Sequence, residues 1–184
     1  MSDTSLTHHL FSDCLWLRCT GRGSFVNSPA LKSAAEQYLN DGGSTIVVDL
    51  ELCPGVDSTF MGTLAGLARR CMAVGGTLQI ASPTARAREA MESLGLDMLM
   101  EIDPMGAFWA DDIEERRAAL AGDSAAPVAE EVPLSELART RHVLEAHNTL
   151  RSMNRQNDET FGYVCETLEE DLLRQTEEQE GDEA

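Results

Sequence analysis

The sequence predicts an α/β protein in which helices cover a mostly parallel central sheet and a long amphipathic helix follows. Strand-like and helix-like segments alternate over residues 1–105, which is the pattern of an α/β sandwich with right-handed crossovers. The segment 45–50 is short, β-branched and apolar almost throughout, as in a strand buried on both faces. Beyond residue 134, apolar residues recur at every third or fourth position, as in an amphipathic helix.

Local signals predict each element of the first domain. We expect strands at 14–19, 45–50, 77–81 and 98–102. The first helix begins at Asn27-Ser28-Pro29, where a capping residue precedes a proline in the first turn. The second is expected over 61–73, directly after the turn that carries Ser58, and the third begins at Ser82-Pro83. Paired glycines at 42–43 and 75–76 end the first two helices.

The chain is expected to divide into four parts. Residues 1–105 form the folded domain, 106–134 a linker with a short helix, 135–175 one long amphipathic helix, and 176–184 a disordered acidic tail. Asn157 lies on the apolar seam of the long helix, and such an asparagine fixes register in helix pairs. The seam could pair with a second helix, form a coiled-coil homodimer, or pack back on the domain.

Charge and composition exclude several classes of partner. The net charge is −18, of which −3 falls in residues 1–100 and −15 in 101–184, and Lys32 is the only lysine. Nucleic acids and anionic membranes select clustered Lys and Arg, so neither is expected as a partner. The sequence has no apolar run long enough to span a membrane and no signal-peptide pattern, so we expect a cytoplasmic protein without membrane insertion. The five cysteines lack metal-ligand spacing, and we expect no metal and no cofactor.

Ser58 is the residue most suggestive of function. It stands in Val56-Asp57-Ser58-Thr59, between the strand at 45–50 and the second helix. A hydroxyl at a helix N-terminus lies beside free backbone N–H groups, where a phosphate would be favoured. Phosphorylation would add about −1.5 to −2 charges at this point. The alternative is that Asp, Ser and Thr before this helix are ordinary capping residues.

Several words of the sequence, in this order and at this spacing, resemble the STAS family, the domain of bacterial anti-sigma factor antagonists. The resemblance covers residues 14–102. The matching words are Thr20-Gly21-Arg22, Ser28-Pro29-Ala30-Leu31, Ile46-Val47-Val48-Asp49-Leu50, Val56-Asp57-Ser58-Thr59-Phe60-Met61-Gly62, Leu67-Ala68-Arg69-Arg70, Gly75-Gly76-Thr77-Leu78 and Leu94-Gly95-Leu96. The resemblance implies a STAS-like sandwich and a regulatory protein-binding module.

The resemblance also implies a phosphorylation switch. In such antagonists a cognate serine kinase, which is also the anti-sigma factor, phosphorylates the serine after the aspartate. Ser58 would then be the phosphate acceptor, Thr59 a reserve hydroxyl, and Asp57 the residue that orients the loop, while Phe60 and Met61 would complete the partner-binding surface. The family commonly has glycine where Phe60 stands. Phe60 is therefore either an exposed partner anchor or a core residue.

Two other classes of function compete with the switch. STAS-like domains also serve as non-phosphorylated adaptor subunits of larger assemblies, such as lipid-transport ATPase complexes, and an intact Ser58 is compatible with that role. An enzyme with Ser58 as nucleophile is not expected, because no G-x-S-x-G motif surrounds it. The four histidines, which could supply a base, are also expected to lie in terminal segments away from Ser58: His8, His9, His142 and His147.

Overall fold

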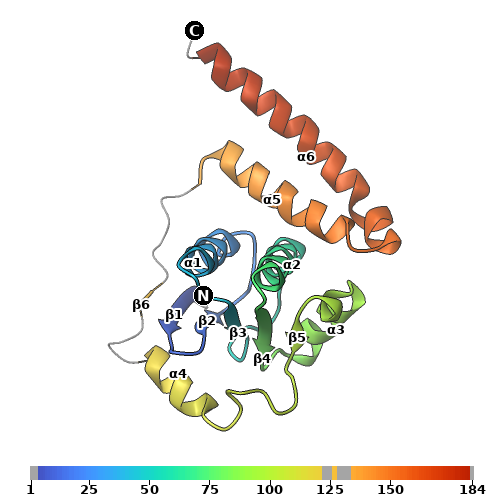
Figure 1. The fold of residues 1–184 in the computed structure, drawn as a ribbon. Helices are drawn as coiled ribbons and strands as arrows, with labels where there is room; N and C mark the ends of the chain where they lie inside the picture. Colours follow the sequence, from blue (N-terminus) through green and yellow to red (C-terminus); the bar gives the residue numbers. More distant parts are fainter. Residues whose placement is uncertain (1–3, 122–125, 128–133, 183–184) are drawn as a thin grey trace.

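A single mixed sheet forms the centre of the computed structural model, which describes residues 4–121, 126–127 and 134–182 (Figure 1). The strands are β1 (Ser5–Leu10), β2 (Leu15–Thr20), β3 (Thr45–Asp49), β4 (Thr77–Ala81), β5 (Glu101–Ile102) and β6 (Ala126–Pro127). Their order is β5-β4-β3-β2-β1-β6. Strands β2 to β5 are parallel, and β1 is antiparallel to both β2 and β6. The predicted α/β fold with a mostly parallel sheet is confirmed.

Both ends of the predicted strand set need correction. His8 and His9 do not lie in a loose terminal segment, because β1 pairs along its whole length with β2. The last strand is only two residues long, and a 3-10 turn, η1 (Leu96–Met98), precedes it. Gly95 begins that turn with a φ of 79°, a conformation that glycine adopts readily, and this turn replaces the start of the expected strand.

Three helices cover one face of the sheet. They are α1 (Ser28–Asn40), α2 (Ser58–Ala73) and α3 (Ala85–Ser93). Alternate residues of β2, namely Leu15, Leu17 and Cys19, point into the main core beneath them. Helix α2 is the most deeply placed, because residues on almost every side of its first three turns are buried. This central position explains why its N-terminus, and Ser58 with it, lies at a fixed place above the sheet.

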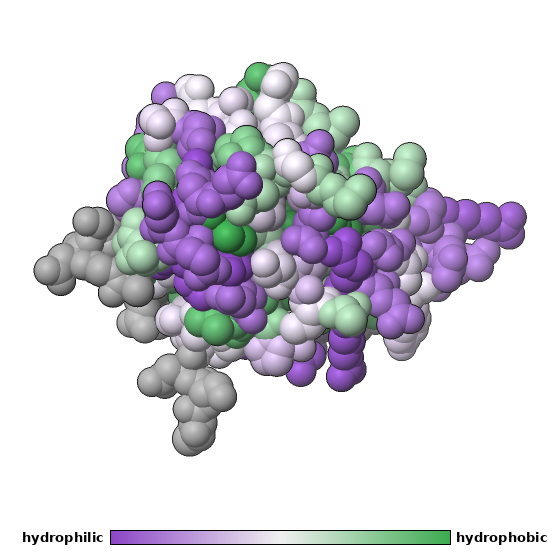
Figure 2. All heavy atoms as spheres, turned by 90° about the horizontal axis from the view of Figure 1, so that it is seen from below, coloured by the Kyte–Doolittle hydropathy of each residue, from purple (hydrophilic) through white to green (hydrophobic). Residues whose placement is uncertain are grey.

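The opposite face of the sheet is covered by residues that were expected to be a linker. Trp109 and Leu120, from the segment that ends in α4 (Ile113–Ala121), form a second core with Trp16 of β2. The Trp16 and Trp109 rings meet edge to face with centroids 5.6 Å apart. The short helix expected within 106–134 is α4, but the segment up to Ala121 packs against the sheet and is not a free linker. Figure 2 views this side from below, where hydrophilic and hydrophobic side chains are interspersed over the surface.

The C-terminal segment is a helical hairpin and not one continuous helix. Helix α5 (Glu136–Arg151) ends at Ser152, and α6 (Arg155–Asp182) packs back along it (Figure 1). Asn154 begins the second helix, because its side-chain oxygen accepts a hydrogen bond from the Asn157 N–H at 2.8 Å. Asn157 is buried and donates to the Leu150 carbonyl at 3.1 Å, so it closes the hairpin within one chain.

Helix α6 also extends through most of the expected acidic tail. Residues 176–182 continue the helix, and only residues 183–184 of that tail lie outside the described part of the chain. Glu and Gln are good helix formers, and a helix already nucleated by packing adds residues at little cost. Within the described residues, no helix is long and apolar enough to cross a membrane.

Candidate functional site

Asp57 caps helix α2 and joins it to the neighbouring loop. Its Oδ1 accepts from the Phe60 N–H at 2.8 Å, and its Oδ2 accepts from the Phe25 N–H at 3.0 Å. Loop 21–27 is thereby held against the N-terminus of α2, and the Asp57 N–H completes the junction by donating to the Gly23 carbonyl at 2.9 Å. Because Asp57 is the capping residue, the hydroxyl of Ser58 is not needed for the cap.

The Ser58 hydroxyl instead meets a histidine from the C-terminal hairpin. Its Oγ lies 2.9 Å from Nε2 of His147, and Nδ1 of His147 lies 2.9 Å from the Val143 carbonyl oxygen. A carbonyl only accepts, so in the neutral ring Nδ1 carries the proton and Nε2 accepts from the serine. The expectation that the histidines lie away from Ser58 is wrong for this residue. No local pattern could have shown the contact, since it joins positions 89 residues apart.

A second histidine of α5 contacts the N-terminus of α1. His142 is buried, and its Nε2 lies 2.8 Å from the Ser28 hydroxyl and 3.5 Å from the Thr63 hydroxyl. Both contacts join α5 to residues of the first domain. The two histidines of the hairpin therefore lie over serines that open two neighbouring helices.

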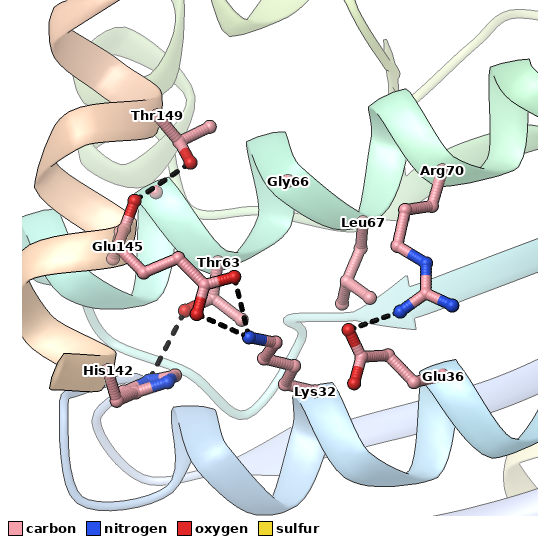
Figure 3. Close-up of a pocket in the computed structure, with 11 residues that line it drawn as sticks. Lys32, Glu36, Thr63, Gly66, Leu67, Arg70, His142, Glu145 and Thr149 are labelled. Carbon is pink, nitrogen blue, oxygen red and sulfur yellow. Dashed lines mark hydrogen bonds and ion pairs between the residues drawn. The ribbon is translucent and has the colours of Figure 1, made fainter. Parts of the chain in front are cut away.

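A small cavity of about 170 Å³ lies where α1, α2 and α5 meet (Figure 3). Its charged walls are already paired: Lys32 contacts both carboxylate oxygens of Glu145 at 2.7 and 2.6 Å, and Arg70 pairs with Glu36. Among the described residues, no three His, Cys, Asp or Glu side chains gather closely enough to hold a metal ion.

The residues that follow Ser58 face the core. Phe60 is fully buried, and its ring fills the space beside Gly23, where an added Cβ would lie only 3.1 Å from it. Of the two readings of Phe60, the core reading is therefore correct. Met61 and Thr59 are also buried, with 7% and 4% of their surface exposed. In this conformation the expected contact surface at Phe60 and Met61 and the reserve hydroxyl at Thr59 are not accessible.

Exposed apolar side chains lie instead on the two loops beside Ser58. Phe25, Val26 and Leu52 are 45%, 70% and 49% exposed. The backbone links their loops, because the Gly21 N–H donates to the Leu52 carbonyl at 3.0 Å and Asp57 accepts from the Phe25 N–H. Both loops follow parallel strands at the same edge of the sheet. We call these three residues the loop patch. Sequence analysis missed it, because both segments have the composition of ordinary turns.

Two thiols lie beneath the loop patch. Cys19 and Cys53 are fully buried, and a hydrogen bond from the Cys19 thiol lowers the pKa of Cys53. The pKa of Cys19 is correspondingly raised, because it keeps the shared proton and is buried. Their burial protects both thiols from reagents in solution.

Comparisons with known proteins agree with this fold. A family model described as "Mlab, STAS domain" matches residues 10–101, half of the chain, and the chain therefore belongs to the STAS family. The family resemblance predicted from the sequence is confirmed. Helix α4 and the α5–α6 hairpin lie outside the matched residues. No curated protein sequence matches the chain.

Among solved structures, the chain is similar to a Thermotoga maritima protein described as a candidate anti-sigma factor antagonist. The two are 20% identical with a TM-score of 0.50, over 60% of this chain and 92% of that one. An anti-sigma factor antagonist from Mycobacterium paratuberculosis is 17% identical with a TM-score of 0.50, over 65% of this chain and 96% of that one. At these identities the similarity shows a common fold.

Proposed function

We propose that this protein is a non-enzymatic, regulatory binding module that docks a protein partner on the loop patch beside Asp57 and Ser58. The observation that carries the proposal is the exposure of Phe25, Val26 and Leu52 around the capped N-terminus of α2. Neighbouring exposed apolar side chains on two connected loops are typical of a protein interface, and aromatic residues often dominate its binding energy.

The finer proposal is that Ser58 is the switch of this surface. A cytoplasmic serine kinase that is also an anti-sigma factor would bind the unmodified form and phosphorylate Ser58. The added phosphate would lie at the N-terminus of α2, beside the carboxylate of Asp57, and would change the charge of the surface without refolding the domain. Ser58 is preferred over Thr59 because Ser58 is half-buried whereas Thr59 is buried.

Affinity purification from the native cells tests the docking surface. Phe25→Ala is expected to reduce recovery of the bound partner by tenfold or more, in line with a hot-spot residue. Phe108→Ala is the matched control, because Phe108 has the same 45% exposure but lies in the segment covering the opposite face of the sheet. Equal recovery with both variants would show that the loop patch does not bind the partner.

Phosphosite mass spectrometry on the same purified protein tests the switch. We expect a phosphate on Ser58 and a serine kinase among the bound proteins. A well-sampled peptide that carries Ser58 without modification, together with a stable non-kinase assembly, would exclude the switch and leave the docking surface in place.

One observation favours an adaptor role as the second candidate. The Ser58 hydroxyl already contacts His147 beneath α5, so it is engaged within the chain and not presented to a kinase. In that case the chain would be a constitutive STAS subunit of a larger assembly, of the kind that includes lipid-transport ATPase complexes. Ser58→Ala separates the two: loss of regulation supports the switch, and an unchanged assembly supports the adaptor.

A further inference from the structure

Helix α5 lies directly on the N-terminal half of α2, the helix that carries Ser58. The two helices approach closely at Gly62, where an added Cβ would lie 2.2 Å from the Ala146 carbonyl oxygen. One turn further along α2, an added Cβ at Gly66 would meet nothing closer than the Thr149 hydroxyl at 4.0 Å. The absence of a side chain at Gly62 is thus what lets the two helices approach so closely at this level.

Polar contacts between α5 and the domain surround this point. Besides the contacts of His147 with Ser58 and of His142 with Ser28, Lys32 of α1 pairs with Glu145 (Figure 3). Arg69 of α2 donates to the Ser152 hydroxyl at 3.0 Å, near the end of α5. Water can replace each of these contacts when the helices separate, so separation leaves few polar groups without a partner.

The two helices of the hairpin also contact each other. Arg151 pairs with Asp158 across the turn, and the Asn157 amide donates both to the Leu150 carbonyl and to the Leu94 carbonyl of the domain. The Phe161 ring of α6 lies against His147, with ring centroids 5.4 Å apart. Helix α6 therefore supports the ring that contacts Ser58, while Leu144, Leu150 and Phe161 of the hairpin join the main core of the domain and would lose apolar burial if the hairpin moved.

We propose that the α5–α6 hairpin is an autoinhibitory cap that closes over Ser58. The loop patch stays open in the capped form, whereas Ser58 is half-buried and its hydroxyl is held by His147 of α5. A partner can touch the patch first, and it reaches Ser58 only after α5 has moved. This inference deepens the proposed function and rests on it, because it assigns the accessibility of the same serine to a segment of the same chain.

Thiol labelling of full-length Ser58→Cys tests the cap without any partner. A thiol beneath α5 is labelled fastest while α5 is displaced. The labelling rate of the introduced cysteine therefore reports how often α5 leaves its place on α2. In this background, Gly62→Ala places a methyl group against the α5 backbone and is expected to raise the labelling rate about tenfold or more. Gly66→Ala is the matched control: it makes the same change in the same helix, where there is room, and it should leave the rate unchanged.

Two details make the comparison fair. The parent chain gives the background, because all five native cysteines are buried and one of them, Cys53, has a lowered pKa. Rates are compared at equal thiolate fraction, taken from the pH–rate profile of each variant, because moving His147 also changes the pKa of the introduced thiol.

A variant in α5 controls for the possibility that Gly62→Ala disrupts the folding of α2 itself. Ala146→Leu leaves the sequence of the domain untouched and should also raise the labelling rate, with faster hydrogen exchange confined to α5 and α6. The cap is refuted if neither variant labels faster than Ser58→Cys alone, or if Gly66→Ala accelerates labelling as much as Gly62→Ala does. Failure here leaves the docking proposal standing, because Phe25→Ala tests that separately.

Discussion

Phe60→Ala is expected to lower the free energy of unfolding by roughly 3–5 kcal/mol, the usual loss for a buried phenylalanine replaced by alanine. The side chain is fully buried and its ring contacts the backbone of Gly23 closely, so the loop cannot easily close over the space it leaves. In a chain of this length, each kcal/mol lowers Tm by about 2–4 °C, which corresponds to a fall of roughly 6–20 °C. Phe25→Ala, at an exposed position of the adjoining loop, should change stability by less than about 0.5 kcal/mol.

Urea denaturation followed by circular dichroism measures both changes. The midpoint should fall for the Phe60 variant with the slope m unchanged, which would show loss of stability without a change in the denatured state. Phe60→Leu, which keeps most of the volume, should lose about 1–1.5 kcal/mol. A loss below about 1 kcal/mol for Phe60→Ala, or an equal loss for Phe25→Ala, would refute the assignment of Phe60 to the core and Phe25 to the surface.

Three further predictions concern the parts that hold this site in place. Arg117→Ala should cost about 3–5 kcal/mol in thermal or urea denaturation, because it leaves the fully buried carboxylate of Asp49 without the guanidinium that contacts it at 3.0 Å. Asn157→Ala should cost about 1–3 kcal/mol and speed hydrogen exchange in α5 and α6, because two carbonyls lose its buried amide. Arg116 lowers the pKa of Asp13 through a hydrogen bond, so this pair stabilises the fold above the unfolded pKa of about 3.9 and the contribution is lost as pH falls through the folded value. In the Asp13→Asn variant, the free energy of unfolding should therefore fall less steeply as the solution is acidified. The difference should be less than about 0.5 kcal/mol, because Asp13 is exposed.

The predictions for Arg117 and Asn157 each have a control in the same region. Arg116→Ala should cost less than Arg117→Ala, because the carboxylates that Arg116 leaves behind are exposed to water. Asn154→Ala should speed exchange only near the hairpin turn, because it removes the cap at the start of α6, whereas its amide contact with the Leu94 carbonyl is long, at 3.4 Å. An Arg117 variant as stable as the parent chain, or a pH dependence of stability unchanged by Asp13→Asn, would contradict the corresponding ion-pair argument.

The central strands and the serine could be predicted because their signals are local. Strand β3 follows from an unbroken β-branched run, and the start of α2 follows from Asp57 and the apolar stripe behind it. The hairpin could not be predicted in this way, because Leu150, Met153, Asn157 and Phe161 keep helical spacing straight through the turn. Only the cap formed by Asn154 marks the break, and a single asparagine is a weak signal.

The residues that come together around Ser58 and beneath the sheet could not be predicted, because tertiary contacts bring them together and no local pattern encodes those contacts. The contact of His147 with Ser58 requires α5 to return to α2, and the role of Trp109 requires an acidic segment to fold beneath the sheet. The sequence alone did not decide whether the Phe60 side chain faces the core or the solvent, because a residue in the first turn of a helix can do either. Burial beneath Gly23 settles that direction.

Photo-crosslinking in the native cells tests the central claim, that the partner docks beside Ser58, most directly. Benzoylphenylalanine would replace either Phe25 on the loop patch or the equally exposed Phe108 in the segment that covers the opposite face. The account predicts a covalent adduct with one protein partner from position 25 and none from position 108. An adduct from position 108 alone would contradict it and would move the interface to the α4 side of the sheet.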